Sequence, residues 1–193
     1  MKIGLISDTH MPGGATEIPF QVFDVFKGVD LILHAGNIYT ASILDDLESI
    51  APIKAAGSLD RDKPSYGDPR VEEKQLLEAE GHTVGVIHDL SVPGFGDRVY
   101  PGSLKRRSNP AYPGLPFEDG KAIVPDDVFG KPVDIVVFGH TCFAMIEEYG
   151  DLMIINPGSP TLRNELRKIG TVGILDLSPG KREANIIDLA ELS

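Results

Sequence analysis

Residues 2–10 read Lys-Ile-Gly-Leu-Ile-Ser-Asp-Thr-His, a short apolar run that ends in polar side chains. A continuous apolar run of this kind predicts a buried β-strand. The strand would span residues 2–7, and Asp8 and His10 would follow at its carboxyl end. Both are residue types that bind metal ions, so the same stretch indicates where chemistry could occur.

The first third of the chain alternates between predicted strands and predicted helices. Apolar residues recur at helical spacing in two segments, and Thr40, a typical N-cap residue, precedes the second of them. This alternation is typical of a parallel sheet covered by helices. The predicted elements are strands at 2–7, 31–34 and 52–56 and helices at about 17–26 and about 40–50.

The remainder of the chain favours hairpins. Turn-like pairs at Gly81-His82 and Gly150-Asp151 separate short apolar runs. Residues 91–132 are rich in proline and glycine, and a loop of this length is more often functional or mobile than neutral. We therefore expect one mixed-sheet α/β domain over residues 1–193 with an insertion at about 91–132. The further predicted strands are 72–80, 83–88, 133–138, 144–149, 152–155, 172–177 and 184–188.

Composition limits the classes of partner. The net charge of −11 argues against broad binding to nucleic acid or to anionic membranes, because both need a basic surface. The single cysteine, Cys142, cannot form an internal disulfide, which is typical of a reducing compartment. No apolar stretch approaches the roughly 20 residues that span a bilayer. We expect a cytoplasmic protein without a membrane segment.

Polar residues of metal-ligand type follow five predicted strands. Taken singly, each is weak evidence: Asp8 and His10 could cap a helix, and His88 or His140 could be a hydrogen-bonded structural histidine. Together they predict one shared site, because ligands bind outside the carboxyl ends of the strands in open α/β sheets. The five segments are Asp8-Thr9-His10, Gly36-Asn37, Gly57-Ser58-Leu59-Asp60, His88-Asp89 and Gly139-His140-Thr141-Cys142. By contrast, His34 lies inside a strand and is expected to be packed and bonded to backbone.

The order of these segments resembles the signature of the calcineurin-like metallophosphoesterases: Asp-x-His, Gly-Asp, Gly-Asn-x-Asp, His and Gly-His-x-His. The chain looks most like their small YfcE-type phosphodiesterase branch. Asn156-Pro157-Gly158-Ser159 is similar to a further segment of that family. The resemblance implies a two-sheet β-sandwich flanked by helices (αββα) with mixed sheets. It also implies hydrolysis of phosphate esters by a hydroxide held between two metal ions.

The resemblance assigns roles to individual residues. Asp8, His10, His88 and His140 would be catalytic, and Asp60, Asn156 and Gly158 would bind the substrate, a small phosphate ester. Arg163 and Arg167, which follow the Asn-Pro-Gly-Ser segment, could reach a phosphate. The first metal would be bound by Asp8, His10, Asn37 and Cys142, and the second by Asn37, Ser58, His88 and His140.

Three of these metal positions depart from the family pattern. Asn37 stands where the family has the bridging Asp, and a neutral carbonyl oxygen is a poor bridge between two cations that repel each other. Ser58 replaces Asn and is too short to reach a metal directly. Cys142 replaces His; it could be a zinc-binding thiolate or a small buried apolar residue.

We therefore expect a single bound divalent ion, Zn or Mn, rather than two. It would be held by Asp8, His10 and Cys142, or by His88 and His140 with help from Asp60 or Asp89. The resulting hypothesis is a metal-dependent phosphoesterase with weakened activity and a degenerate two-metal site.

The alternative is a catalytically inactive homologue that acts as a protein-binding scaffold. The retromer scaffold subunit is similar to these phosphoesterases and also carries Asn at the bridging position. Residues 91–132 could form a lid over a substrate, or a surface for a protein partner or a second copy of the chain.

Overall fold

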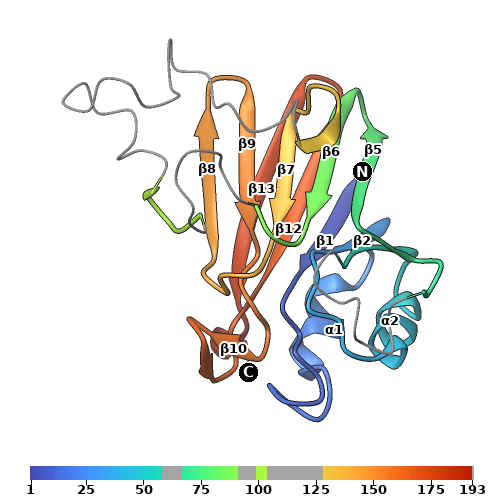
Figure 1. Cartoon of the computed structure of the whole chain (residues 1–193), viewed down its shortest axis with the longest axis vertical. Coiled ribbons are helices and arrows are strands. Elements are labelled where there is room, and N and C mark those ends of the chain that lie inside the picture. The colour runs from blue at the N-terminus through green and yellow to red at the C-terminus, as the bar shows by residue number, and fades with distance from the viewer. Residues whose placement is uncertain (58–66, 91–98, 104–127, 193) are drawn as a thin grey trace.

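The computed structural model of the protein describes residues 1–57, 67–90, 99–103 and 128–192. In this part of the chain two β-sheets pack face to face, and two helices lie against one of them (Figure 1). The predicted fold class, an α/β sandwich of two mixed sheets flanked by helices, is confirmed. None of the helices in the described ranges could span a lipid bilayer.

The first sheet contains six strands in the order β13-β12-β1-β2-β3-β4. Strands β1 to β4 run parallel, whereas β12 runs antiparallel to both of its neighbours. The first three predicted strands are therefore confirmed as parallel neighbours. The strands are β1 (Lys2–Ile6), β2 (Leu31–His34), β3 (Ile53–Ala56), β4 (Val71–Glu72), β12 (Thr171–Ser178) and β13 (Lys181–Asp188).

The second sheet contains five strands in the order β5-β6-β7-β9-β8. Strands β6, β7 and β9 are parallel, and β5 and β8 pair antiparallel at the two edges. The first hairpin turns at Glu80-Gly81, one residue earlier than predicted, and both residues have positive φ, as in a type I′ turn. The strands are β5 (Lys74–Ala79), β6 (His82–Ile87), β7 (Ile135–Phe138), β8 (Met145–Tyr149) and β9 (Leu152–Asn156).

Two helices and three short elements complete the described chain. Helix α1 (Phe20–Phe26) begins later than predicted, because Pro19 disfavours helical backbone at the residue before it. Helix α2 (Ala41–Glu48) has Thr40 at its N-cap position, as predicted, but the Thr40 hydroxyl makes no capping hydrogen bond. Strands β10 (Leu162–Arg163) and β11 (Leu166–Arg167) form a separate hairpin, and a 3-10 helix, η1 (Leu189–Glu191), lies near the C-terminal end.

Two apolar layers hold the sandwich together. One fills the space between the sheets, and the other fills the space between the first sheet and the helices. Gly4 belongs to the second layer: a Cβ there would lie 3.0 Å from Cδ1 of Phe26, so α1 packs directly on β1. Buried residues of the inter-sheet layer include Ile3, Leu5, Leu33, Val86 and Val137; those of the helical layer include Ile6, Val22, Phe26, Leu44 and Leu47.

Described parts of the predicted insertion pack on the outer face of the second sheet. Val99 and Phe129 belong to a third apolar cluster with Val136 and Phe138 of β7. Only glycine fits at position 85 beneath them, since a Cβ there would lie 2.6 Å from the Phe129 ring. Residues 91–98 and 104–127 of the predicted insertion lie outside the described residues.

Arg70 ties the edge of the first sheet to helix α2. Its guanidinium donates hydrogen bonds to Asp45 at 2.7 Å, to Glu48 at 2.7 Å and to Asp68 at 2.6 Å. The hydrogen bond from Arg70 holds the pKa of Asp68 below its ordinary value of 3.8. A carboxyl whose pKa is lowered on folding stabilises the native state above its unfolded pKa and loses that contribution in acid.

We expect Arg70→Gln to lower the free energy of unfolding at pH 7 by about 1–2 kcal/mol, through loss of charge-assisted hydrogen bonds. The deficit should shrink as the pH falls below 3.8, the ordinary pKa of Asp68. Urea denaturation at pH 7 and in acid measures both values. Lys131→Gln, which removes an exposed ion pair to Glu78, is the control and should change stability little. An equal deficit at both pH values would contradict the role of the Asp68 charge.

Candidate functional site

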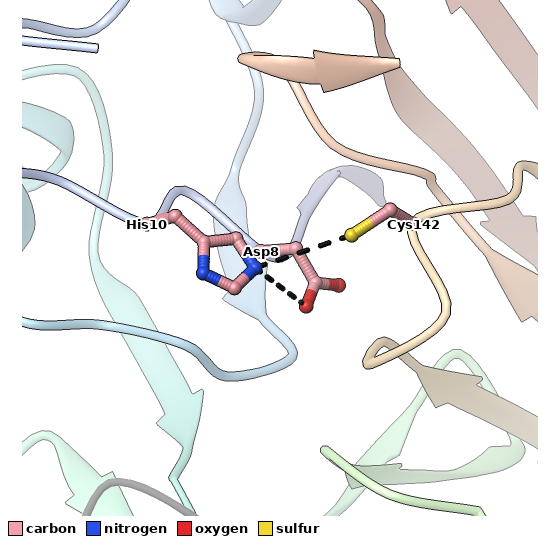
Figure 2. A group of neighbouring side chains, drawn as sticks. All are labelled: Asp8, His10 and Cys142. Atoms are coloured by element: carbon pink, nitrogen blue, oxygen red, sulfur yellow. Dashed lines mark hydrogen bonds and ion pairs between the residues drawn. The ribbon is translucent and has the colours of Figure 1, made fainter. Parts of the chain in front are cut away.

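The loops that follow β1 and β7 bring three metal-ligand side chains together. Figure 2 shows Asp8, His10 and Cys142 directed toward one another. His10 Nε2 lies 3.5 Å from Asp8 Oδ1 and 4.0 Å from Cys142 Sγ. The three ligand atoms all lie within 4.8 Å of one another, a spacing at which one ion could contact all of them.

Asn37, from the loop after β2, joins this group. Its amide nitrogen lies 2.8 Å from Asp8 Oδ1 and 3.1 Å from His10 Nε2. Because an amide nitrogen only donates, His10 Nε2 is an acceptor and its proton lies on Nδ1. That Nδ1–H donates to the Tyr39 hydroxyl at 2.6 Å. The tautomer therefore leaves the Nε2 lone pair on the side of the ligand group, as a metal-binding histidine requires.

The Asp8 carboxylate is fully buried and remains ionised. Its Oδ2 accepts a hydrogen bond from the backbone N–H of His140 at 2.9 Å. Burial by itself raises the pKa of Asp8, but hydrogen bonds within the site, such as the one from the Asn37 amide, outweigh it and lower the pKa below 3.8. A negative charge is therefore fixed at the centre of the site, where it can attract a cation.

His88 and His140 lie side by side on the same site. Their rings meet edge to face with centroids 5.2 Å apart. His88 Nδ1 donates to the carbonyl oxygen of Ala35 at 2.6 Å. Its buried Nε2 has no hydrogen-bond partner in the part of the chain that the structure describes. A histidine with one nitrogen bound to a carbonyl and a free lone pair on the other is typical of a metal ligand.

Two glycines allow the strand ends to approach this closely. A Cβ at Gly36 would lie 2.3 Å from His88 Nδ1, and φ there is +93°. A Cβ at Gly139 would lie 2.5 Å from the Ala35 carbonyl oxygen and 2.7 Å from Asp8 Oδ2. Any larger residue at either position would push the ligand side chains apart.

The site also concentrates left-handed backbone at residues other than glycine. Elsewhere in the described residues, such positions are Glu80, Asn164 and Glu165, all in hairpin turns. Such conformations cost energy and are typical of functional sites, where surrounding structure enforces them. The site residues with positive φ are Asp8 (53°), His10 (49°), Asn37 (59°), His140 (70°) and Cys142 (57°).

A family model identifies the family to which the chain is related. The model described as a calcineurin-like phosphoesterase superfamily domain matches residues 1–180.

The chain belongs to the calcineurin-like phosphoesterase superfamily.

The resemblance stated from the sequence motifs is thereby confirmed. Curated relatives of this superfamily member agree with the model. The chain is 39% identical over 165 residues to a probable metallophosphoesterase of Methanothermobacter thermautotrophicus, an alignment that covers 84% of this chain and 78% of the relative. It is 34% identical over 196 residues to a probable metallophosphoesterase of Methanocaldococcus jannaschii, covering 99% of this chain and 83% of the relative.

Solved structures share the fold at lower identity. A Vps29 mutant from Entamoeba histolytica superimposes with a TM-score of 0.63 at 18% identity, covering 97% of this chain and 99% of that one. An archaeal phosphodiesterase superimposes with a TM-score of 0.59 at 20% identity, covering 97% and 100%. Another Vps29 structure from Entamoeba histolytica, a zinc complex, has a TM-score of 0.61 at 19% identity, covering 98% and 99%.

Three predicted metal-site residues remain: Ser58, Asp60 and Asp89. Ser58 and Asp60 lie outside the described residues. Asp89 is half-buried, and among the described residues it forms no converging ligand group with His88 and His140. The group that does converge corresponds to the first predicted ion position.

Asn156 and Gly158 stabilise the loop that carries His140. The Asn156 amide donates to the Gly139 carbonyl oxygen at 3.0 Å and to Thr141 Oγ1 at 3.1 Å, and its oxygen accepts from Gly158 N–H at 2.9 Å. These bonds use both N–H donors of the amide and fix the loop that carries His140. Contact of Asn156 or Gly158 with a substrate stays a prediction.

Sequence reasoning missed the hydroxyls that hold the Asp8 loop. Ser7 Oγ donates to the Gly158 carbonyl oxygen and Ser159 Oγ donates to the Asp8 carbonyl oxygen, both at 2.7 Å. Tyr39 was also missed, although it lies only two positions after Asn37. The hydroxyl of Ser159 within the Asn-Pro-Gly-Ser segment was the one available signal.

His34 was expected to be a packed histidine, and this is confirmed. It is fully buried, its Nδ1 accepts from Gly36 N–H at 3.2 Å, and its Nε2 lies 3.3 Å from Thr9 Oγ1. Burial lowers its pKa to about 3, so the ring is neutral at physiological pH. His34 therefore shapes the loop of Asn37 without adding charge.

We expect Gly36→Ala to destabilise the protein more than Gly28→Ala. Both place a Cβ at positive φ, which costs roughly 1–2 kcal/mol. At Gly28 no atom lies within 4 Å of the new Cβ, whereas at Gly36 the His88 ring lies at 2.3 Å. The clash should add about 2 kcal/mol or more, measured by urea denaturation. Equal losses in the two variants would show that the site tolerates the contact.

Proposed function

We propose that this chain is a metal-dependent phosphoesterase whose degenerate two-metal site holds one divalent ion. The observation that carries the proposal is the convergence of Asp8, His10 and Cys142 within 4.8 Å in a member of the calcineurin-like phosphoesterase superfamily. The buried Nε2 of His88, which has no partner among the described residues, supports it, because a buried acceptor without a partner is unfavourable unless something binds it.

The donor set fits a divalent ion. Asp8 supplies a buried carboxylate, His10 an imidazole with its lone pair directed inward, and Cys142, a buried residue, a sulfur. A carboxylate, an imidazole and a thiolate together favour zinc over manganese, because thiolate is a soft ligand. Two negative charges from Asp8 and a Cys142 thiolate would neutralise the ion.

Asn37 is the reason to expect one ion rather than two. Two divalent ions about 4 Å apart repel strongly and need an anionic bridge to stay together. The Asn37 amide instead directs its N–H groups at Asp8 Oδ1 and His10 Nε2. It therefore contributes no negative charge, and its donors face the atoms that the first ion would need.

A bound divalent ion supplies one kind of chemistry in such a site: it activates water at neutral pH and polarises a phosphoryl oxygen. Side chains of the protein would hold the ion and bind the phosphate. Asp8 fixes the charge that retains the cation. His140, edge to face with His88 at 5.2 Å, would donate a hydrogen bond to the phosphate or to the leaving oxygen.

Metal analysis tests the number of ions. Protein loaded with excess zinc or manganese and then desalted should retain one ion per chain, measured by mass spectrometry of the metal. Cys142→Ser should weaken zinc binding roughly 10- to 100-fold or more. Losing a residue that only hydrogen-bonds to a metal ligand already has an effect of that size, and Cys142 would bind the ion directly. His82→Ala is the control, because the His82 ring bonds to the Ser178 carbonyl oxygen and is not part of the ligand group. Two tightly held ions per chain would refute the proposal.

Hydrolysis of a generic aryl phosphodiester tests the activity. We expect slow metal-dependent turnover that is lost in His140→Ala and unchanged in His82→Ala. Asn37→Asp restores a bridging carboxylate and should raise turnover about tenfold or more, because a second ion can then steady the leaving oxygen. Turnover that is independent of metal, or unaffected by His140→Ala, would contradict the assigned site.

The second candidate function is a protein-binding scaffold. It is favoured by Asn37 and by the structural likeness to Vps29, one structure of which, from Chaetomium thermophilum, is complexed with a cyclic peptide. Residues 91–132 would then contact a protein partner or a second copy of the chain. The same assay distinguishes the two functions: a natural chain without turnover that gains turnover in Asn37→Asp would be a scaffold. Location in the cytoplasm stays a prediction under either function.

A further inference from the structure

A cleft of about 180 Å³ lies between the loop after His10 and the β10–β11 hairpin. These two segments, far apart in sequence, lie at the same end of the molecule (Figure 1). The apolar lining of the cleft includes Ala15, Pro19, Pro160 and Ile169. Its charged lining residues are Arg167 and Lys168. The cleft shares no residue with the ligand group of Asp8, His10 and Cys142.

Among the described residues, the two cations of the cleft have no acidic partner. Arg163, on the same hairpin, pairs with Asp188 at 2.6 Å. Arg167 and Lys168 are exposed, and neither forms an ion pair with any residue in the described ranges. In a chain with a net charge of −11, two unpaired neighbouring cations beside a cleft form a local anion-attracting site.

The apolar part of the cleft limits the size of a ligand. Pockets for drug-sized molecules usually measure about 300–1,000 Å³, so 180 Å³ suits only a small group. Pro160 is buried, and Ala15, Pro19 and Ile169 are half-buried, so they offer aliphatic surface and no charge. The cleft therefore combines room for a short aliphatic body with two cations for a head group.

We propose that this cleft binds a small amphiphilic anion: an aliphatic group of about five carbons that carries a carboxylate or a phosphate. The aliphatic part would lie against Ala15, Pro19 and Ile169. The head group would bind Arg167, whose guanidinium forms paired hydrogen bonds with either kind of anion, and Lys168 would add charge.

The cleft is joined to the ligand group through backbone contacts. Thr161 Oγ1, in the cleft wall, donates to the Thr9 carbonyl oxygen at 2.8 Å, and Gly14 N–H donates to the His10 carbonyl oxygen at 2.6 Å. A ligand in the cleft therefore contacts the loop that carries Asp8 and His10. Binding itself needs no metal, so it can be tested apart from the proposed function.

The experiment is a two-dimensional amide NMR titration of the full chain, freed of metal by chelation and dialysis. The probes are 4-methylpentanoate and isopentyl phosphate, with neutral 4-methylpentanamide as the matched control. Saturable shifts at the amides of Gly14, Thr161 and Ile169, with at least about fivefold tighter binding of an anion than of the amide, support the proposal. Equal binding of the neutral amide, or no saturable shift at these residues, overturns it.

Variants locate the interaction. Arg167→Gln with Lys168→Gln should weaken binding of the anions about fivefold or more and leave the neutral amide unchanged. Lys27→Gln with Lys181→Gln removes the same charge from exposed positions elsewhere and should have little effect. Ala15→Leu keeps both cations but fills the cleft, and it should abolish binding of all three probes. Undiminished anion binding in Ala15→Leu, or an equal loss in both charge variants, would show that the cleft is not the site.

Discussion

The buried charge of Asp8 is the constraint on which this end of the molecule depends. An ionised carboxylate with no solvent exposure is strongly unfavourable unless donors surround it. Those donors come from separate loops: the backbone N–H of His140 after β7 and the side-chain amide of Asn37 after β2. The hydrogen bonds to this one carboxylate therefore link the two sheets at the carboxyl ends of their parallel strands.

Asn37 makes that solvation independent of a cation. Its two N–H donors satisfy one carboxylate oxygen and one imidazole nitrogen, the same two atoms that an ion would bind. An aspartate at this position would instead bring a second negative charge beside Asp8 and would depend on bound metal to offset the repulsion. The amide thus gives the site a smaller negative charge than an aspartate would.

Much of the fold and part of the site could be predicted from the sequence. Buried parallel strands are short apolar runs, and the polar residues that follow them meet at one end of a sheet, so the convergence of Asp8, His10 and Asn37 could be anticipated. The supporting hydrogen bonds could not. Ser7 and Ser159 bond to backbone atoms 151 positions away, and no local pattern specifies such a partner. The orientation of the Asn37 amide likewise depends on neighbours that only the folded chain supplies. The start of α1 was misjudged because Pro19 overrode the apolar periodicity.

The left-handed residues around Asp8 have a consequence for how this protein can change. Each left-handed residue costs roughly 1 kcal/mol or more relative to a favoured backbone conformation. The five costs together approach the net stability of a typical domain. Glycine at any of these five positions would relax the backbone but remove a side chain from the site. Backbone stability and the side chains of the site are therefore opposed at the same residues. All five positions nevertheless carry side chains, so the protein keeps this backbone cost.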